Sequence, residues 1–122
     1  MPVVDIQFVL PAGRDLPEGT AAALAQALGQ AMSAAPGTLW LRLHTLPASR
    51  YAENGPAAED AELPVFVTML QARPATGPAL QAEATAVAQA VARTIGLPRT
   101  KVHIEYAPPG AGRVAFGGQL VH

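Results

Sequence analysis

An apolar run of strand length, VVDIQFVL, occupies residues 3–10 and is closed by the turn sequence Pro-Ala-Gly at residues 11–13. A short apolar run bounded by Pro and Gly is typical of a buried β-strand. Residues 17–33 then carry apolar side chains four positions apart, which predicts an amphipathic helix with Pro17 in its first turn. Residues 38–46 alternate leucines with polar or aromatic side chains, which predicts a second strand with two different faces. The first half of the chain is therefore predicted to form a β-α-β unit.

The second half of the chain repeats the first at a spacing of 62 or 63 residues. Prolines match at the shorter spacing, and the helical stripe Leu24, Leu28, Met32 matches Val87, Val91, Ile95 at the longer one. We predict a tandem duplication within a single domain, residues 1–122, built from two pseudo-repeats at about residues 2–55 and 64–118. The Gly-, Pro- and carboxylate-containing stretch over residues 48–63 is predicted to be a solvated connector.

Two β-α-β units imply an α/β fold in which each helix connects two parallel strands. A helix that joins two strands makes them parallel, with a right-handed crossover. Two such units give a four-stranded sheet with two helices on one face. The other face stays uncovered in one chain, so we predict a ring-like oligomer in which sheets of several subunits meet.

Composition excludes several classes of function. The chain has 122 residues, a net charge of −1 and a single lysine, so we expect neither a nucleic-acid nor a membrane partner. It has no cysteine and three scattered histidines, so we expect no metal site. The start lacks the basic and apolar segments of a signal peptide, and no apolar stretch approaches 18 residues, so we expect a cytoplasmic location.

Pro2 is the first candidate for chemistry. Removal of the initiator methionine would expose a secondary amine at the start of a strand. An ordinary α-amino group has a pKa of roughly 7.7 to 8.0, and burial or nearby cations lower it toward neutrality, where a general base works best. The simpler interpretation is that this proline only begins a strand.

The opening Met-Pro, the two β-α-β units and the turn after each second strand resemble the tautomerase superfamily over nearly the whole chain. Local motifs support this resemblance. Residues 16–19, 102–106 and 114–118 are similar to macrophage migration inhibitory factor, and Arg42-Leu43-His44 is similar to 5-carboxymethyl-2-hydroxymuconate isomerase. Residues 10–15 resemble the carboxylate-binding loop of 4-oxalocrotonate tautomerase.

The resemblance implies a homotrimeric, cofactor-independent isomerase of aromatic compound degradation. It would interconvert keto and enol forms of 2-hydroxymuconate-type unsaturated carboxylic acids, with Pro2 as general base. A carboxylate substrate needs a cation, and arginine can bind a carboxylate through two parallel hydrogen bonds. The resemblance assigns this task to Arg14, Arg42 and Arg73. As alternatives, Arg14 pairs with the adjacent aspartate, Arg73 is solvated, and Arg42 pairs with Glu105 across an interface.

Further candidates surround this predicted site. Trp40, Tyr51 and Phe116 are expected as aromatic walls, with core packing as the alternative. His103 matches a pocket position of macrophage migration inhibitory factor, although the residue type differs, and it could instead pair with a neighbouring charged residue such as Glu105.

Other functions stay open on the same scaffold. A hydratase or dehalogenase would need a carboxylate such as Glu105 to activate water. A decarboxylase is disfavoured, because Ala75 replaces the second arginine of the decarboxylase pair. A binding protein similar to macrophage migration inhibitory factor, with a vestigial pocket, and an inert structural trimer that keeps Met1 are the non-enzymatic alternatives.

Overall fold

A computed structural model describes residues 2–122, with Glu62 described by its backbone alone. Met1 lies outside the described residues, and with it the expected removal of that methionine. The main elements in chain order are β1 (Pro2–Leu10), α1 (Thr20–Ala31), β2 (Trp40–Pro47), β3 (Val65–Gln71), α2 (Gly77–Ile95), β4 (Val102–Tyr106), β5 (Ala115–Phe116) and β6 (Gln119–Leu120). Three short 3-10 turns, η1 (Ala48–Arg50), η2 (Asp60–Glu62) and η3 (Arg99–Lys101), complete the chain.

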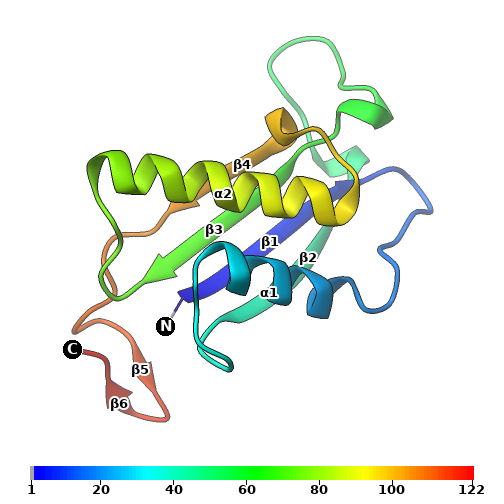
Figure 1. Cartoon of the computed structure of the whole chain (residues 1–122). Helices are drawn as coiled ribbons and strands as arrows, with labels where there is room; N and C mark the ends of the chain where they lie inside the picture. The colour runs from blue at the N-terminus through cyan, green and yellow to red at the C-terminus, as the bar shows by residue number, and fades with distance from the viewer. Residues whose placement is uncertain (1) are drawn as a thin grey trace.

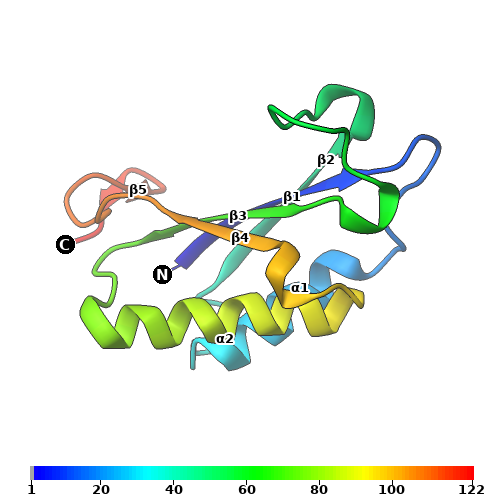
Figure 2. The same cartoon turned by 90° about the horizontal axis from the view of Figure 1, so that it is seen from above.

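Four strands form one mixed sheet in the order β2-β1-β3-β4 (Figure 1). β1 is parallel to β2, β3 is parallel to β4, and the two central strands β1 and β3 are antiparallel to each other. Figure 2 shows α1 and α2 together on one side of this sheet, with the opposite face uncovered. The predicted α/β fold, with two β-α-β units and both helices on one face, is confirmed.

The hydrophobic core lies between the sheet and the two helices. Alternate side chains of β1 and β3 point toward the helices, because successive side chains of a strand lie on opposite faces. The apolar stripes of both helices face them. The fully buried side chains of this core include Val4, Ile6, Leu24, Leu28, Val65, Val67, Met69, Val87 and Val91.

The register of the central strands relates the two units to each other. Asp5 of β1 lies opposite Thr68 of β3, and these residues are 63 positions apart in the chain. Strand residues that are 63 positions apart lie on the same face of the sheet, either toward the helices or away from them. Strand residues that are 62 positions apart lie on opposite faces. Val65, for example, is buried in the core, whereas Val3, 62 positions earlier, is not part of it. The duplication itself stays a prediction from the sequence.

The first helix starts later than the sequence predicts. α1 begins at Thr20, because Gly19 has a φ of 85°, in the left-handed region that cannot continue a right-handed helix. Pro17 therefore lies before the helix, and its carbonyl oxygen accepts a hydrogen bond from the Thr20 hydroxyl at 2.6 Å. Among residues 2–122, no helix is both long and apolar enough to cross a membrane.

Candidate active site

Pro2 begins the central strand β1, where a small cavity opens beside it. Its register partner on β3 is Gln71, and its neighbour Val3 is paired with Trp40 of β2. Pro2 is buried, and the cavity against it has a volume of about 210 Å³. The lining residues are Pro2, Val3, Gly37, Thr38, Trp40 and Phe116. An amine at this position would face mostly apolar walls, which disfavour its protonated form.

Two aromatic residues far apart in the sequence form one wall of this cavity. The rings of Trp40 and Phe116 meet edge to face, with centroids 4.4 Å apart and an interplanar angle of 73°. The indole nitrogen of Trp40 donates a hydrogen bond to the carbonyl of Gly37 at 3.3 Å. Phe116 belongs to the β5-β6 hairpin, which folds back toward the start of the chain (Figure 1). The structure therefore brings two of the three predicted wall residues, Trp40 and Phe116, to Pro2.

Arg73 lies at the same end of the sheet, two residues beyond the register partner of Pro2. Its guanidinium donates a hydrogen bond to the main-chain oxygen of His122 at 2.5 Å. The amide of Gly110 also donates to the carbonyl of Gln71 at 2.8 Å. These two contacts fasten the segment that carries the hairpin to the end of β3.

Arg42 lies on the uncovered face of the sheet and is bound to an acid of its own chain. Its Nε and Nη2 atoms donate to the two carboxylate oxygens of Asp5 at 2.7 and 2.8 Å, in a two-pronged pair. His44 also contacts Asp5, with Nε2 3.1 Å from Oδ1. The hydrogen bond from Arg42 is the main reason why the pKa of Asp5 is lowered. The predicted alternative partner, Glu105, lies on β4, which β1 and β3 separate from β2.

Arg14, Tyr51 and His103 do not reach Pro2 within one chain. Arg14 follows the end of β1, and nine strand residues separate it from the Pro2 end by roughly 25 Å. Tyr51 lies at that same far end, because β2 runs parallel to β1 and ends beside Leu10. Within one chain Tyr51 and His103 therefore lie away from the Pro2 cavity, and their predicted place in the site stays a prediction that requires a neighbouring subunit.

Tyr51 and His103 instead belong to a second aromatic group. The Phe66 ring lies between them, with centroids 6.1 Å from Tyr51 and 5.6 Å from His103. The Tyr51 hydroxyl donates a hydrogen bond to Glu53, which is the main reason why the pKa of Tyr51 is raised. On the sheet face, this group lies at the end away from Pro2.

A polar cluster that was not predicted from the sequence lies beneath the Pro2 end of the sheet. The Tyr106 hydroxyl donates to Oε1 of Glu83 at 3.1 Å, and the Gln71 amide donates to Oε2 at 3.5 Å. Burial is the main reason why the pKa of Tyr106 is raised, and the Glu83 charge adds to it. One signal was present in the sequence: Glu83 stands four residues before Val87, on the apolar stripe of its helix.

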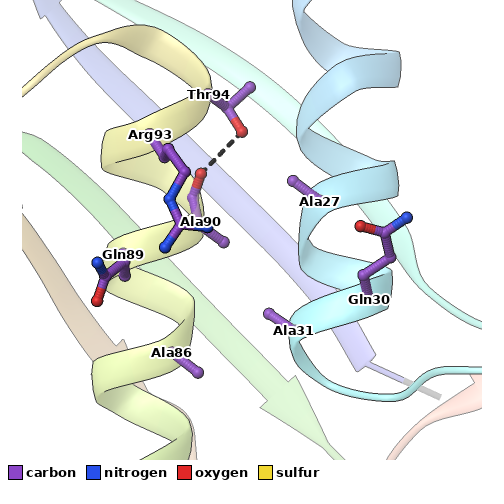
Figure 3. A pocket seen from close by; sticks show the side chains of 8 residues that line it. All are labelled: Ala27, Gln30, Ala31, Ala86, Gln89, Ala90, Arg93 and Thr94. Carbon is purple, nitrogen blue, oxygen red and sulfur yellow. Dashed lines mark hydrogen bonds between the residues drawn. The ribbon is translucent and has the colours of Figure 1, made fainter.

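A larger cavity of about 690 Å³ lies between α1 and α2 (Figure 3). Half of its lining residues are alanines, and Arg93 is its one charged side chain. Within residues 2–122, no three histidine, aspartate or glutamate side chains gather in a way that would hold a metal ion. The smaller cavity is the one that Pro2 lines, which makes it the better candidate for chemistry.

The fold is shared with several solved structures. It matches an F6 fused 4-OT, a wild type asymmetric trimer, with a TM-score of 0.73 and 18% identity over 97% of this chain and 94% of that one. It matches Pt0534 inactivated by 2-oxo-3-pentynoate with a TM-score of 0.73 and 20% identity, over 97% and 94% of the two chains. It also matches macrophage migration inhibitory factor from Oncomelania hupensis, with a TM-score of 0.72 and 20% identity over 100% and 83%.

No family model matches the sequence, and no curated protein matches it either. The fold that the sequence resemblance implied is confirmed by these solved structures.

Proposed function

We propose that this chain is a cofactor-independent keto-enol tautomerase of 2-hydroxymuconate-type unsaturated carboxylic acids, with the amine of Pro2 as general base. The observation that supports this most is the position of Pro2, at the start of a central strand and against an apolar cavity. The fold shared with 4-OT supports it further.

The proposed reaction moves one proton and consumes nothing. Once residue 1 is removed, the Pro2 nitrogen takes the proton of the enol hydroxyl, and the electron pair of that bond forms the carbonyl. The conjugated double bonds shift, and the prolinium returns its proton to a distant carbon. Apolar walls lower the pKa of the amine, so that a larger fraction of it is unprotonated and active at neutral pH.

The substrate carboxylate would be bound by arginine, and Arg73 is the nearest one within the chain. It lies at the Pro2 end of the sheet, where its contact with His122 uses Nη1 and leaves Nη2 and Nε as further donors. Arg42 is held by Asp5 through Nε and Nη2, so a substrate carboxylate would compete with Asp5 for that edge of the guanidinium. Arg14 would have to come from another copy of the chain. Trp40 and Phe116 would pack against the unsaturated part of the substrate.

We propose a homotrimer for two reasons. The sheet face away from the helices is uncovered in one chain and carries exposed aromatic side chains, Trp40 at 51% and Phe66 at 38% exposure. The distance between Arg14 and Pro2 in one chain also means that their cooperation requires a neighbouring subunit.

The decisive experiment follows ketonisation of 2-hydroxymuconate, and of its 5-carboxymethyl analogue, by ultraviolet absorbance. The protein used is one whose intact mass shows loss of Met1. We expect turnover that falls at least a hundredfold in Pro2→Ala, with the oligomer unchanged. A matched control carries one extra residue before Pro2, which blocks the amine but keeps the proline ring, and it should be equally inactive.

Turnover that is equal in the wild type and in Pro2→Ala would refute the proposed role of the proline. Absence of turnover in the wild type would favour a binding role, as in the macrophage migration inhibitory factor whose fold this chain shares.

A further inference from the structure

The two ends of the central strand pair differ in polarity on the helix side. The 63-residue spacing relates each position at the Pro2 end to one at the far end. It matches Gln71 with Phe8, Tyr106 with Leu43, and Glu83 with Thr20. The far end thus has a buried phenylalanine, 2% exposed, where the Pro2 end has an amide bonded to a carboxylate. Local departures from the core pattern of this kind are expected at functional sites.

Gln71 is the member of this cluster that faces Pro2. The two residues are direct partners across β1 and β3, and both side chains are on the helix side, where partner Cβ atoms lie about 5 Å apart. The amide nitrogen of Gln71 is bound to Glu83. Its amide oxygen is shielded from solvent and, among residues 2–122, has no hydrogen-bond partner. A buried acceptor without a hydrogen-bond donor lowers the stability of the folded protein. We therefore expect this oxygen to accept a hydrogen bond from a group that is added or exposed near it.

The Pro2 amine is the donor that this position would gain. While Pro2 is joined to Met1, its nitrogen carries no hydrogen and cannot donate. Removal of residue 1 gives a secondary amine, which carries one hydrogen when neutral and two when protonated.

We propose that Gln71, anchored by Glu83 and Tyr106, positions the Pro2 amine and stabilises its protonated form. This inference rests on the proposed function of Pro2. The apolar cavity lowers the affinity of the amine for a proton, and the carboxylate behind Gln71 opposes that effect. The two effects oppose each other on the pKa of the amine. The amine can therefore take a proton from the substrate and keep it until it returns that proton to the substrate carbon. Gln71 and Glu83 are thus positioning residues that act through Pro2.

Few other ionisable groups compete with Glu83 near this amine. α1 and the hairpin strands β5 and β6 carry none. The ionisable side chains on the surrounding elements are Tyr106 of β4, Arg93 near the end of α2, Arg73 beyond β3, and Arg113 and His122 on either side of the hairpin. On the opposite face of the sheet lie Asp5, Arg42, His44, His103 and Glu105. The high pKa of Tyr106 keeps its hydroxyl a neutral donor to Glu83 at neutral pH.

The test is a titration of the Pro2 amine by ¹⁵N NMR in protein that lacks Met1 and is labelled at proline. Glu83→Gln removes the charge but keeps a hydrogen-bonding side chain of the same size. We expect it to lower the pKa of the amine by about half a pH unit or more. Gln71→Met, which keeps the length of the side chain without its amide, should shift it in the same direction. Glu59→Gln, an exposed carboxylate in the loop at the far end, is the matched control and should leave the titration unchanged.

A second readout uses turnover. The midpoint of the acidic limb of kcat/KM against pH should move to lower pH in Glu83→Gln by the same amount as the NMR titration. An amine titration that coincides in wild type, Glu83→Gln and Gln71→Met would overturn the inference. Because NMR needs no substrate, it decides this question even if 2-hydroxymuconate is not converted, and the two proposals can fail separately.

Discussion

Asp5 accepts hydrogen bonds on the uncovered face of the sheet, where it holds Arg42 and contacts His44. The pair was hidden in the sequence, because it depends on the register of two strands that are 37 residues apart. Once β1 and β2 pair in parallel with Asp5 opposite Arg42, the two charges must meet. The consequence for the proposed function is that a substrate carboxylate would compete with Asp5 for the Nε and Nη2 edge of Arg42.

The Asp5 pair makes the stability of the folded chain depend on acidity. Its carboxyl has a lowered pKa in the folded state, from an ordinary value of 3.8. The stabilisation it provides is therefore complete above that value and is lost as the pH falls through the folded-state pKa. We expect wild type to lose stability more steeply than Asp5→Asn between about pH 5 and pH 2.5. Urea midpoints at one fixed protein concentration measure this, and parallel curves for the two proteins would contradict it.

At the scale of elements, periodicity predicted the strands and helices well, because each of them buries one regular face. Val4 and Ile6 alternate in β1, and Leu24 and Leu28 repeat by four in α1. The sequence predicted less where contacts are not periodic. The β5-β6 hairpin has two-residue strands, and its position follows from Arg73 and Gly110, which bind it to the end of β3 from distant parts of the chain.

The glycine that ends α2 offers a test of helix termination. Gly96 has a φ of 76°, and a Cβ atom there would touch nothing within 4 Å, so backbone strain alone opposes a side chain. We expect Gly96→Ala to lower the free energy of unfolding by about 1 kcal/mol. Gly29, inside α1 and equally open, is the matched control, and Gly29→Ala should raise it by about 0.5 to 1 kcal/mol. Changes of the same sign in the two variants, measured by urea unfolding, would refute this account.

Arg73 could hold the hairpin in place or bind the substrate carboxylate, and the variant Arg73→Ala has a separate readout for each role. If its contact with His122 holds the hairpin in place, Arg73→Ala should speed hydrogen exchange at Val121 and across β5 and β6, in the absence of substrate. If it only binds the substrate carboxylate, exchange should stay unchanged while KM rises. We expect both effects, because the wall residue Phe116 belongs to the hairpin. Arg93→Ala, in the last turn of α2 and away from the hairpin, is the control for loss of a positive charge.

At the scale of the whole molecule, the composition and the single amphipathic stripe of each helix predicted an uncovered sheet face. One chain leaves it uncovered, with β2 and β4 as the two open edges of the sheet. The sequence could not show which predicted site residues share a cavity. Pro2, Trp40 and Phe116 meet within one chain, whereas Arg14 and Tyr51 lie at the far end of parallel strands.

That separation makes a prediction about subunit cooperation. If Arg14 of one subunit serves Pro2 of the next around a ring, Pro2→Ala and Arg14→Ala each leave every site of a homotrimer defective. A 1:1 mixture refolded together contains trimers of both kinds of subunit. Each mixed trimer has one site that combines an intact Pro2 with an intact Arg14, so about a quarter of wild-type turnover should return.

Differently tagged subunits, purified for the presence of both tags, measure this directly. About a third of wild-type turnover is expected in that fraction, because every purified trimer is mixed. If the turnover of the mixture equals the mean turnover of the two variants measured separately, each site uses an arginine of its own chain. Arg73 would then be the candidate. Mixing Pro2→Ala with Glu59→Gln is the control for refolding losses. It restores about half of wild-type turnover with or without exchange of subunits, because every Glu59→Gln subunit keeps both Pro2 and Arg14. Recovery that exceeds the average in the first mixture, and matches it in the second, therefore assigns Arg14 to the site of a neighbouring subunit.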